Sequence, residues 1–548
     1  MIRRRIPALL LLIAVACSEA ALPGEPRVPE ESPPGTGGTG PVASGPFVDA
    51  ICGLPAIQAL RVWRGYYPGR SGELQFVAKP FNFFGGWSHS GPAPYLQRIP
   101  MLFYGPGHVP ALGPVDRGVT MADLAPTLAR FLDFDFETAD GSAMEQAILP
   151  DQAPPRLIFV LVLDGGGRNV LTAYPDAWPN TAELIRRGVW FDNATVGSSP
   201  SVTPAIHTTL GTGVFPRRHG LIDLRLLFDG RLVGPHTAGP QFLRAPTLAD
   251  RYDQALDNEP VIAFVAPEGT LGMIGHGSFL EDADQDFALA QREGSWGLSE
   301  ANQGFYDFPS YINQIGGLNE AARRLDVSDG RQDDAWLGLR VLDTPAQLQL
   351  TPAWTEYQTG VLREVIRREG LGDDDIPDLL FTNYKQIDKV GHEWSFPSVQ
   401  MEAVVGALDR AVGDLVRTLN QEVGRGEWVL ALTADHGVTP REDTTGGFRI
   451  DIGEMLNDIS AAFDGDGDDR NVVSSVRVTQ FWMNTDELAE NGYSLEDVAT
   501  FVMEYTKEQN VLDPNLLPEE ERSETLFAAA FPGPVLEKNL PCLPPTNA

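Results

Sequence analysis

The sequence predicts an α/β/α sandwich with a largely parallel central sheet. Leu157–Leu163 is an unbroken apolar run of strand length, as expected for a buried parallel strand. Two further strand-like runs, Leu379–Tyr384 and Trp428–Ala434, flank Met401–Leu419, where apolar residues recur at the three- and four-residue spacing of an amphipathic helix. Strand, helix and strand in succession indicate parallel strands whose sheet is covered by helices.

The composition sets limits on the class of protein. The chain has 548 residues, enough for one large α/β domain with insertions or for two to three average domains. It carries 75 acidic and 41 basic residues, for a net charge of −34, and its only basic cluster is Arg3–Arg5. This excess of negative charge predicts a solvated surface and no nucleic-acid-binding surface.

The amino-terminal stretch has the pattern of an export signal. Met1–Cys17 begins with basic residues, continues with the apolar run Ile6–Val15 and has one small residue, Ala16, before Cys17. The apolar run is too short for a permanent membrane span. The end of the stretch resembles a bacterial lipoprotein signal, which implies a lipid on Cys17; cleavage near Ala21 without a lipid is the alternative.

The following residues, 18–46, are rich in Pro, Gly, Ser and Glu and lack apolar periodicity, which predicts a disordered tether. Residues 47–548 would then form a single catalytic domain. We therefore expect an exported protein, periplasmic or at the cell surface, whose only membrane contact is the lipid anchor.

Polar residues follow the predicted strands. Asp164 comes directly after Leu157–Leu163 and is followed by three glycines. Thr203 lies in the segment SVTPAIHTTLGTG, where Pro204 favours the first turn of a helix and places the Thr203 hydroxyl at its amino end. Such a hydroxyl is either a nucleophile at an anion site or a helix cap. Ser199 and Ser201 are the alternative nucleophiles.

Two further pairs offer metal ligands. Asp388 and His392 stand four residues apart in a predicted loop after one strand, and Asp435 and His436 are adjacent at the end of another. Ligands in open α/β sheets bind at the carboxyl ends of the strands, so these side chains are expected to converge. Mixed carboxylate and imidazole ligands suit zinc, with manganese or iron as alternatives.

The order of the motifs LDG, TPxxH, DxxGH and ADHG resembles the alkaline phosphatase superfamily, nearest its nucleotide pyrophosphatase/phosphodiesterase branch. The resemblance implies two zinc ions, a small phosphoester substrate and a phosphothreonine intermediate on Thr203. It also implies two ligand sets: Asp164, Asp435, His436 and the Thr203 hydroxyl for one ion, and Asp388, His392 and a further histidine for the other.

The resemblance also implies a circular permutation. No histidine follows His436, although the family's last metal ligand lies in its carboxyl-terminal segment. That segment is similar to the region around His89, so His89 is expected to be the missing ligand. Residues 47–140 would then be the displaced carboxyl-terminal segment, 141–155 the join and 156–548 the family core. The two ends of the chain would then lie close together, at the point where an unpermuted relative has a continuous chain. Cys52 and Cys542 are expected to form a disulfide there; the alternative is two free thiols.

One departure from the family bears on activity. Related enzymes have an asparagine about 21 residues after the nucleophile that holds a phosphoryl oxygen, and here Leu224 occupies this position. We expect a phosphohydrolase, with phosphodiesters slightly favoured as substrates. The alternatives are a phosphomonoesterase with the same site and a non-catalytic surface protein that retains the fold. The sulfatase signature is absent around Thr203. The sequence leaves the natural substrate and the oligomeric state open.

Overall fold

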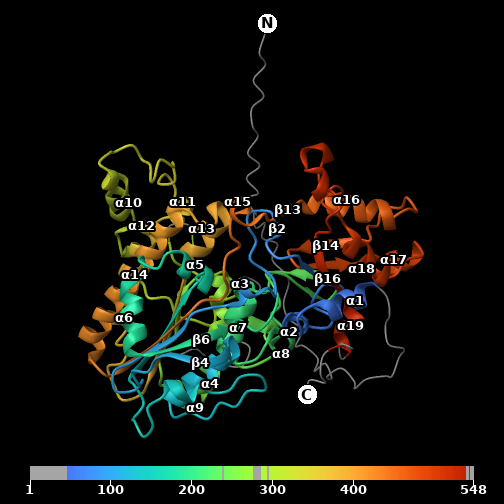
Figure 1. Ribbon diagram of the computed structural model, residues 1–548. Helices are drawn as coiled ribbons and strands as arrows, with labels where there is room; N and C mark the ends of the chain where they lie inside the picture. The colour runs from blue at the N-terminus through green and yellow to red at the C-terminus, as the bar shows by residue number, and fades with distance from the viewer. Residues whose placement is uncertain (1–45, 237–239, 276–285, 293–294, 539–541, 543–548) are drawn as a thin grey trace. The chain divides into compact units, whose positions relative to one another are not determined.

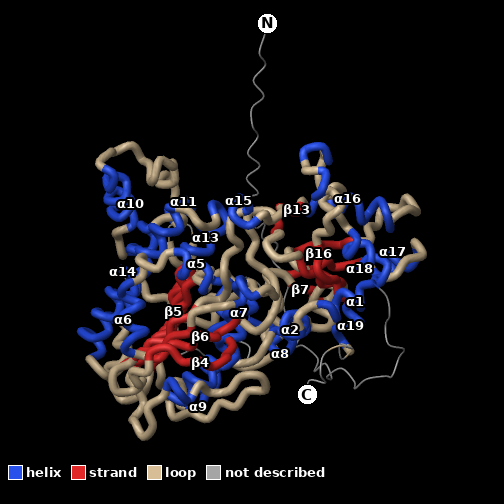
Figure 2. Tube along the Cα trace, viewed as in Figure 1, coloured by secondary structure: helices blue, strands red, loops and turns tan. Residues whose placement is uncertain are grey.

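A computed structural model describes residues 46–236, 240–275, 286–292, 295–538 and 542. Its largest sheet has eight strands in the order β10-β9-β11-β5-β12-β3-β6-β4 (Figures 1 and 2). The strands are β3 (Met101–Tyr104), β4 (Gly113–Thr120), β5 (Leu157–Leu163), β6 (Val189–Thr195), β9 (Ile262–Ala266), β10 (Phe287–Ala290), β11 (Asp378–Tyr384) and β12 (Trp428–Thr433). The predicted α/β sandwich with a largely parallel sheet is confirmed.

The direction of β3 is the exception within this sheet. All other neighbouring strands pair in parallel, whereas β3 runs antiparallel to β12 on one side and to β6 on the other. Met101, the first residue of β3, therefore lies opposite Thr433, the last residue of β12. As a result, the chain enters β3 at the edge of the sheet where its neighbours end.

Helices cover both faces of the sheet (Figure 1). On one side α14 packs against α6, α12 and α13, and on the other α7 packs against α4, α8 and α9. The helices are α1 (Pro46–Gly53), α2 (Ala56–Gly65), α3 (Pro94–Gln97), α4 (Leu124–Phe131), α5 (Arg168–Ala173), α6 (Pro179–Arg187), α7 (Thr203–Thr212), α8 (Pro216–His219), α9 (Leu248–Ala255), α10 (Leu318–Asp326), α11 (Pro345–Leu348), α12 (Pro352–Arg368), α13 (Gln386–Trp394), α14 (Val399–Leu419), α15 (Glu442–Thr445), α16 (Ile452–Phe463), α17 (Thr485–Glu490), α18 (Leu495–Glu504) and α19 (Gly533–Glu537). The stripe predicted for Met401–Leu419 is buried in α14.

A second, four-stranded antiparallel sheet joins the two ends of the chain. Its order is β14-β15-β1-β16, with β1 (Leu74–Ala78), β14 (Val473–Arg477), β15 (Gln480–Met483) and β16 (Phe527–Pro532). Figure 1 shows the blue α1 beside the red β16 and α18, which it contacts. Cys52, in α1, forms a disulfide with Cys542, with the Cα atoms 5.5 Å apart.

Two short strand pairs complete the described secondary structure. Strand β2 (Phe83–Phe84) pairs in parallel with β13 (Arg449–Ile450), and β7 (Leu226–Phe228) forms an antiparallel pair with β8 (Arg231–Val233). The pairing of β2 with β13 lies a few residues before His89 and ties the amino-terminal segment to the chain that follows β12.

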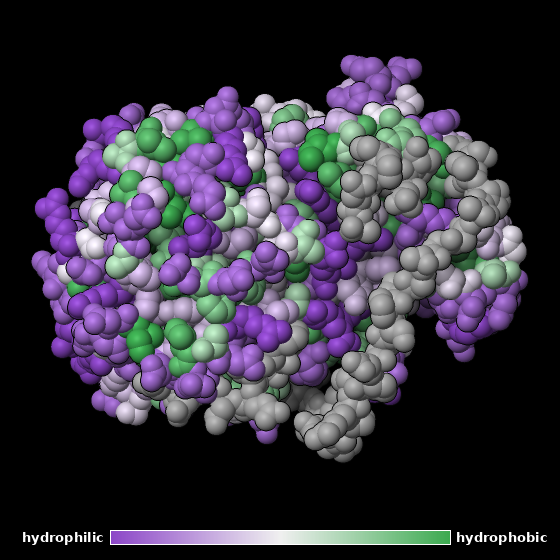
Figure 3. Space-filling view, turned by 90° about the horizontal axis from the view of Figure 1, so that it is seen from below, coloured by the Kyte–Doolittle hydropathy of each residue, from purple (hydrophilic) through white to green (hydrophobic). Residues whose placement is uncertain are grey.

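The surface in Figure 3 carries hydrophilic residues around separate, small groups of hydrophobic ones, as expected for a face exposed to water. Among the described residues, no helix combines the length and the apolar character needed to cross a bilayer. The expected signal at residues 1–17, with Cys17, and all but the last residue of the expected tether lie outside the described residues. Pro46, assigned to the tether from the sequence, is the first residue of α1.

Candidate active site

The candidate residues meet at one edge of the eight-stranded sheet. Six of them follow strands that end there, and the seventh precedes the reversed strand β3, which begins there. They are Asp164 after β5, Thr203 after β6, Asp388 and His392 after β11, Asp435 and His436 after β12, and His89 before β3.

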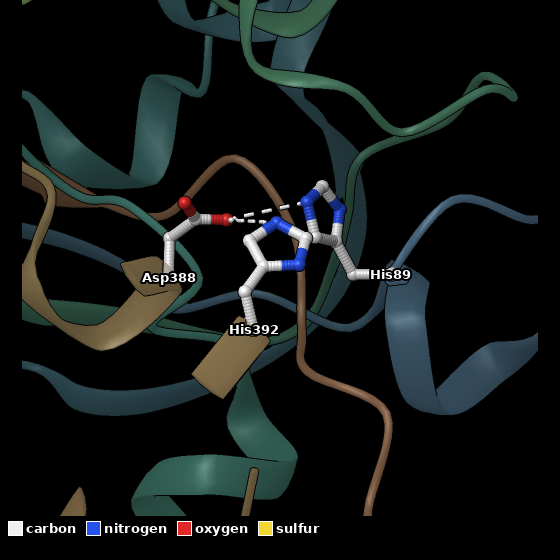
Figure 4. A group of neighbouring side chains, drawn as sticks. All are labelled: His89, Asp388 and His392. Atoms are coloured by element: carbon white, nitrogen blue, oxygen red, sulfur yellow. Dashed lines mark ion pairs between the residues drawn. The ribbon is translucent and has the colours of Figure 1, made fainter. Parts of the chain in front are cut away.

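The first group contains His89, Asp388 and His392 (Figure 4). The Nε2 atoms of His89 and His392 lie 3.2 Å and 3.4 Å from the same oxygen, Oδ1 of Asp388. The other ring nitrogen of each histidine lies beside a backbone carbonyl oxygen: Nδ1 of His89 at 3.1 Å from Ser201 and Nδ1 of His392 at 2.9 Å from Gly86. These contacts fix both rings with Nε2 towards the carboxylate.

The loop expected around Asp388 and His392 is wrong, because both residues lie in the helix α13. Their four-residue spacing places them on one helix face, where they can share a ligand. The chain leaves β11 and turns into α13 within two residues, which brings Asp388 to the edge of the sheet.

The second group contains Asp164, Asp435 and His436, all fully buried. Nε2 of His436 lies 3.3 Å from Oδ2 of Asp435 and 3.5 Å from Oδ1 of Asp164. The other carboxylate oxygen of Asp435, Oδ1, accepts a hydrogen bond from the backbone N–H of Gly165 at 3.0 Å. The two groups are neighbours: the rings of His89 and His436 stack with centroids 3.5 Å apart.

Thr203 is the first residue of α7, and Val202 is the cap. No side chain caps this helix, so the Thr203 hydroxyl does not serve as its cap. Instead, Oγ1 of Thr203 accepts a hydrogen bond from the Lys385 ammonium at 2.7 Å. The amino end of a helix also favours anions, because its first N–H groups are free and its dipole is positive there.

Lys385 connects the two groups and the threonine. Its Nζ lies 2.7 Å from Oδ1 of Asp164 and 3.0 Å from Oδ2 of Asp388. Burial opposes the charge of Lys385, but these carboxylates raise its pKa above the ordinary value. The side chain is therefore an ammonium at the centre of the site.

Three carboxylates share this buried space with a single lysine. Burial raises the pKa of Asp164 to about 7, with Asp435 adding to the effect. Burial also opposes the charge on Asp435 and Asp388, but His436 lowers the pKa of Asp435, and Lys385 lowers that of Asp388. Burial lowers the pKa of His89 to about 3, which keeps the ring in the neutral form that binds metals.

The residues fit divalent cations. Within the described part of the chain, Oδ1 of Asp388, Oδ2 of Asp435 and Nε2 of His436 are buried and make no hydrogen bond. Each belongs to a group whose three ligand atoms lie within 4.8 Å of one another. Buried polar atoms rarely lack a partner, so ligand atoms that converge in this way indicate cation sites.

Residues 158–530 match the family model described as type I phosphodiesterase / nucleotide pyrophosphatase. The chain belongs to this family. The phosphodiesterase-family protein is thus a hydrolase of phosphoester bonds, and the superfamily expected from its motifs is confirmed. His89 lies in front of the matched residues.

Two curated phosphatases are similar to this phosphodiesterase-family protein. Alkaline phosphatase PafA of Elizabethkingia meningoseptica is 23% identical over 426 residues, which cover 65% of this chain and 74% of that protein. Alkaline phosphatase PhoV of Synechococcus elongatus is 31% identical over 330 residues, 52% of this chain and 60% of that protein. The crystal structure of wild-type PafA has a TM-score of 0.53 at 19% identity and covers 64% of this chain and 77% of that chain, which shows a common fold.

Two polar residues at the site, Lys385 and Asn383, were not predicted from the sequence, and His207 was noted only as the histidine of the TPxxH motif, without a role. The Asn383 amide donates to Oδ2 of Asp164 at 2.8 Å and contacts Nε2 of His207 at 2.7 Å. Nδ1 of His207 lies 2.7 Å from the backbone carbonyl of Thr203. The available signals were the position of Asn383 and Lys385 at the end of a strand and the four-residue spacing between Thr203 and His207.

A third acidic group lies apart from these two, in the loop after α16 and in α17, and consists of Asp464, Asp466 and Glu487. Nε of Arg470 lies 2.8 Å from Oε2 of Glu487, so the buried carboxylate of this group already has a cationic partner. Leu224, at the position of the family's asparagine, is 47% exposed and has no side-chain donor.

Proposed function

We propose that this protein is a two-metal phosphohydrolase that forms a phosphothreonine intermediate on Thr203. The observation that carries the proposal is the position of Oγ1 of Thr203: it is bound to the ammonium that also contacts Asp164 of one ligand group and Asp388 of the other. A hydroxyl at the amino end of α7, beside two cation sites, suits attack on a phosphorus atom.

Asp388, His392 and His89 would hold one ion, and Asp164, Asp435, His436 and Thr203 the other. Zinc suits these ligands, and manganese or iron can replace it in such sites. When bound, the ions would lower the pKa of the Thr203 hydroxyl and neutralise the phosphoryl oxygens.

The remaining steps belong to the residues of the chain. The Thr203 hydroxyl loses its proton to water, and Oγ1 attacks phosphorus in line with the ester bond. The bond from Oγ1 to phosphorus forms as the ester bond breaks, and the leaving oxygen departs with the electron pair. The positive end of the α7 dipole lies at Thr203 and favours the negative charge of the transferred group. Water then hydrolyses the phosphothreonine.

Thr203→Ala tests this function. We expect kcat/KM to fall by about 10⁴-fold or more for both nitrophenyl phosphate and bis(nitrophenyl) phosphate, as for other covalent nucleophiles. Metal content, measured by mass spectrometry, should stay close to two ions per chain, and a phosphorylated peptide containing Thr203 should be trapped only in the wild type. Thr485→Ala is the matched control because Thr485 is also the first residue of a helix and is exposed.

Activity of Thr203→Ala near that of the wild type would exclude Thr203 as the nucleophile. A wild-type protein that binds metal but turns over neither ester would favour the alternative of a non-catalytic surface protein, to which Leu224 points. Hydrolysis of a diester and of a monoester would use the same attack by Thr203. The two activities would differ in how well the site binds the second negative charge of a monoester.

We also propose the circular permutation. Its support is that the segment 47–140 lies outside the matched residues yet supplies β3 and β4 of the large sheet and His89 of the site. A variant in which residues 47–140 follow residue 538 should fold and bind two metal ions. An unfolded or metal-free product from this variant, with the natural chain folding normally beside it, would contradict the permutation.

We propose, finally, that the protein is exported and carries a lipid on Cys17. The signal pattern of residues 1–17 supports export, and the disulfide suits an oxidising compartment. Cys17→Ser should move the protein from the membrane fraction to the soluble fraction. Retention in the membrane fraction would exclude lipidation as the anchor.

A further inference from the structure

The site holds a cation of its own, Lys385, which the family resemblance does not assign. Lys385 follows β11 directly and caps α13, and its side chain is 18% exposed. An ammonium has three N–H donors, and here they face three acceptors: Thr203, Asp164 and Asp388.

The geometry points to a direct role with the substrate. Nζ of Lys385 lies 2.7 Å from Oγ1 of Thr203, the oxygen proposed to attack phosphorus. The phosphoryl oxygens of any group that Oγ1 attacks therefore come within reach of the same ammonium. Lysine is a common phosphate ligand that acts as a compact point charge.

The chain also lacks the donor that related enzymes place at this oxygen. Leu224 stands at the position of that asparagine, has an apolar side chain and is 47% exposed. The N–H that Lys385 gives to Oγ1 of Thr203 can pass to a phosphoryl oxygen when Oγ1 bonds to phosphorus, and it carries a full positive charge, which an amide does not have. The replacement thus changes the charge of the site as well as its donor.

Charge distinguishes the two classes of ester. At neutral pH a phosphomonoester carries close to two negative charges on the transferred group, because its second pKa is about 6, whereas a diester carries one. Attraction to a fixed cation grows with the charge of its partner and is strong in a buried site. An ammonium beside the nucleophile therefore favours the monoester.

We propose that Lys385 is a catalytic residue that binds the transferred phosphoryl group in place of the missing amide and gives this protein a preference for phosphomonoesters over diesters. The inference rests on the proposed function of Thr203. Lys385 acts through its position and takes no part in the bond changes, in which the bond from Oγ1 to phosphorus forms while the ester bond breaks.

The test compares Lys385→Met and Lys385→Gln with the wild type on nitrophenyl phosphate and bis(nitrophenyl) phosphate, which share a leaving group. We expect kcat/KM for the monoester to fall about 100-fold, the usual effect of losing one donor to the developing charge, and that for the diester by less than about 10-fold. Lys385→Gln keeps a donor without the charge and suits the buried carboxylates better, so it carries the test if Lys385→Met does not fold. Lys538→Met, at an exposed lysine, is the control.

Two measurements do not depend on turnover. Inorganic phosphate should bind the Lys385 variants at least about 10-fold more weakly in isothermal titration calorimetry, as expected for losing a charged contact. Metal content should match that of the wild type. Equal losses for both esters, unchanged phosphate binding, or loss of a metal ion from the variants would each overturn the proposal, the last because Lys385 would then act by arranging the ligands.

Thr203→Ala distinguishes failure of the proposed role of Lys385 from failure of the proposed function through Thr203. If Thr203→Ala retains activity, the proposed function fails. If it is inactive but the Lys385 variants keep the wild-type ratio of monoester to diester turnover, only the role of Lys385 fails.

Discussion

Replacement of His89 by alanine tests whether the amino-terminal segment, 47–140, supplies a metal ligand to the site. The ring lies with Nε2 3.2 Å from Asp388, donates a hydrogen bond from Nδ1 to the backbone carbonyl of Ser201 and stacks on His436. Its removal takes one of three side chains from the first group and leaves Asp388 and His392, of which His392 is 44% exposed. Loss of a residue that merely orients a ligand weakens metal binding by about 10- to 100-fold, so loss of the ligand should cost at least about 100-fold at this ion.

The measurement is metal content after dialysis against a zinc buffer that saturates the wild type. We expect the wild type to retain two ions per chain and His89→Ala to retain one, with kcat/KM reduced by several orders of magnitude. His108→Ala is the matched control, because His108 is also a buried histidine whose ring contacts a backbone carbonyl, that of Gly426 at 2.8 Å. Two ions bound to His89→Ala with wild-type affinity would refute the assignment of His89 as a ligand.

Three further predictions follow from the structure. Treatment with a chelator should abolish turnover of both nitrophenyl esters, and zinc should restore it; activity that persists in metal-free protein would contradict the two-ion site. Replacement of both Cys52 and Cys542 by serine should lower the free energy of unfolding by about 2 to 5 kcal/mol, since the disulfide closes a loop of 490 residues; an unchanged denaturation midpoint would show that the bond contributes nothing. Burial raises the pKa of Asp378 to about 6, so its stabilising contribution is full below pH 4 and is lost as the pH rises through 6. The free energy of unfolding of Asp378→Asn, relative to that of the wild type, should therefore rise by about 3 kcal/mol between pH 4 and pH 7, and a constant difference in urea denaturation would disprove the shift.

Local pattern was sufficient for the central strands and for most of the site. The all-apolar run Leu157–Leu163 is β5 without a change of boundary, because an apolar run of this length is typical of a strand buried on both faces. Asp164 and Asp435 could be placed at one edge because parallel strands end together. The helix around Asp388 was missed because α13 is short, although the four-residue spacing to His392 was already a helical signal.

Non-local pairing could not be derived in the same way. Leu74–Ala78 was predicted as a strand, but nothing near it in the chain indicates that β15 and β16, some four hundred residues later, are its neighbours. The reversed direction of β3 is equally invisible to local pattern, and it decides which edge His89 reaches. Lys385 was missed for a related reason. A lysine after a strand is unremarkable by itself, and only the fold brings Asp164 and Thr203, from two other segments, to the ammonium beside Asp388 of its own helix.

The position of β1 between β15 and β16 determines when the protein can finish folding. During synthesis the segment that contains β1 and His89 leaves the ribosome about four hundred residues before its strand partners β15 and β16. Contacts of such high sequence separation form slowly and only in a complete chain. Export is proposed for this protein, and a polypeptide that crosses a membrane before it folds gains from this delay, because the segment with β1 cannot complete its sheet until β15 and β16 are present.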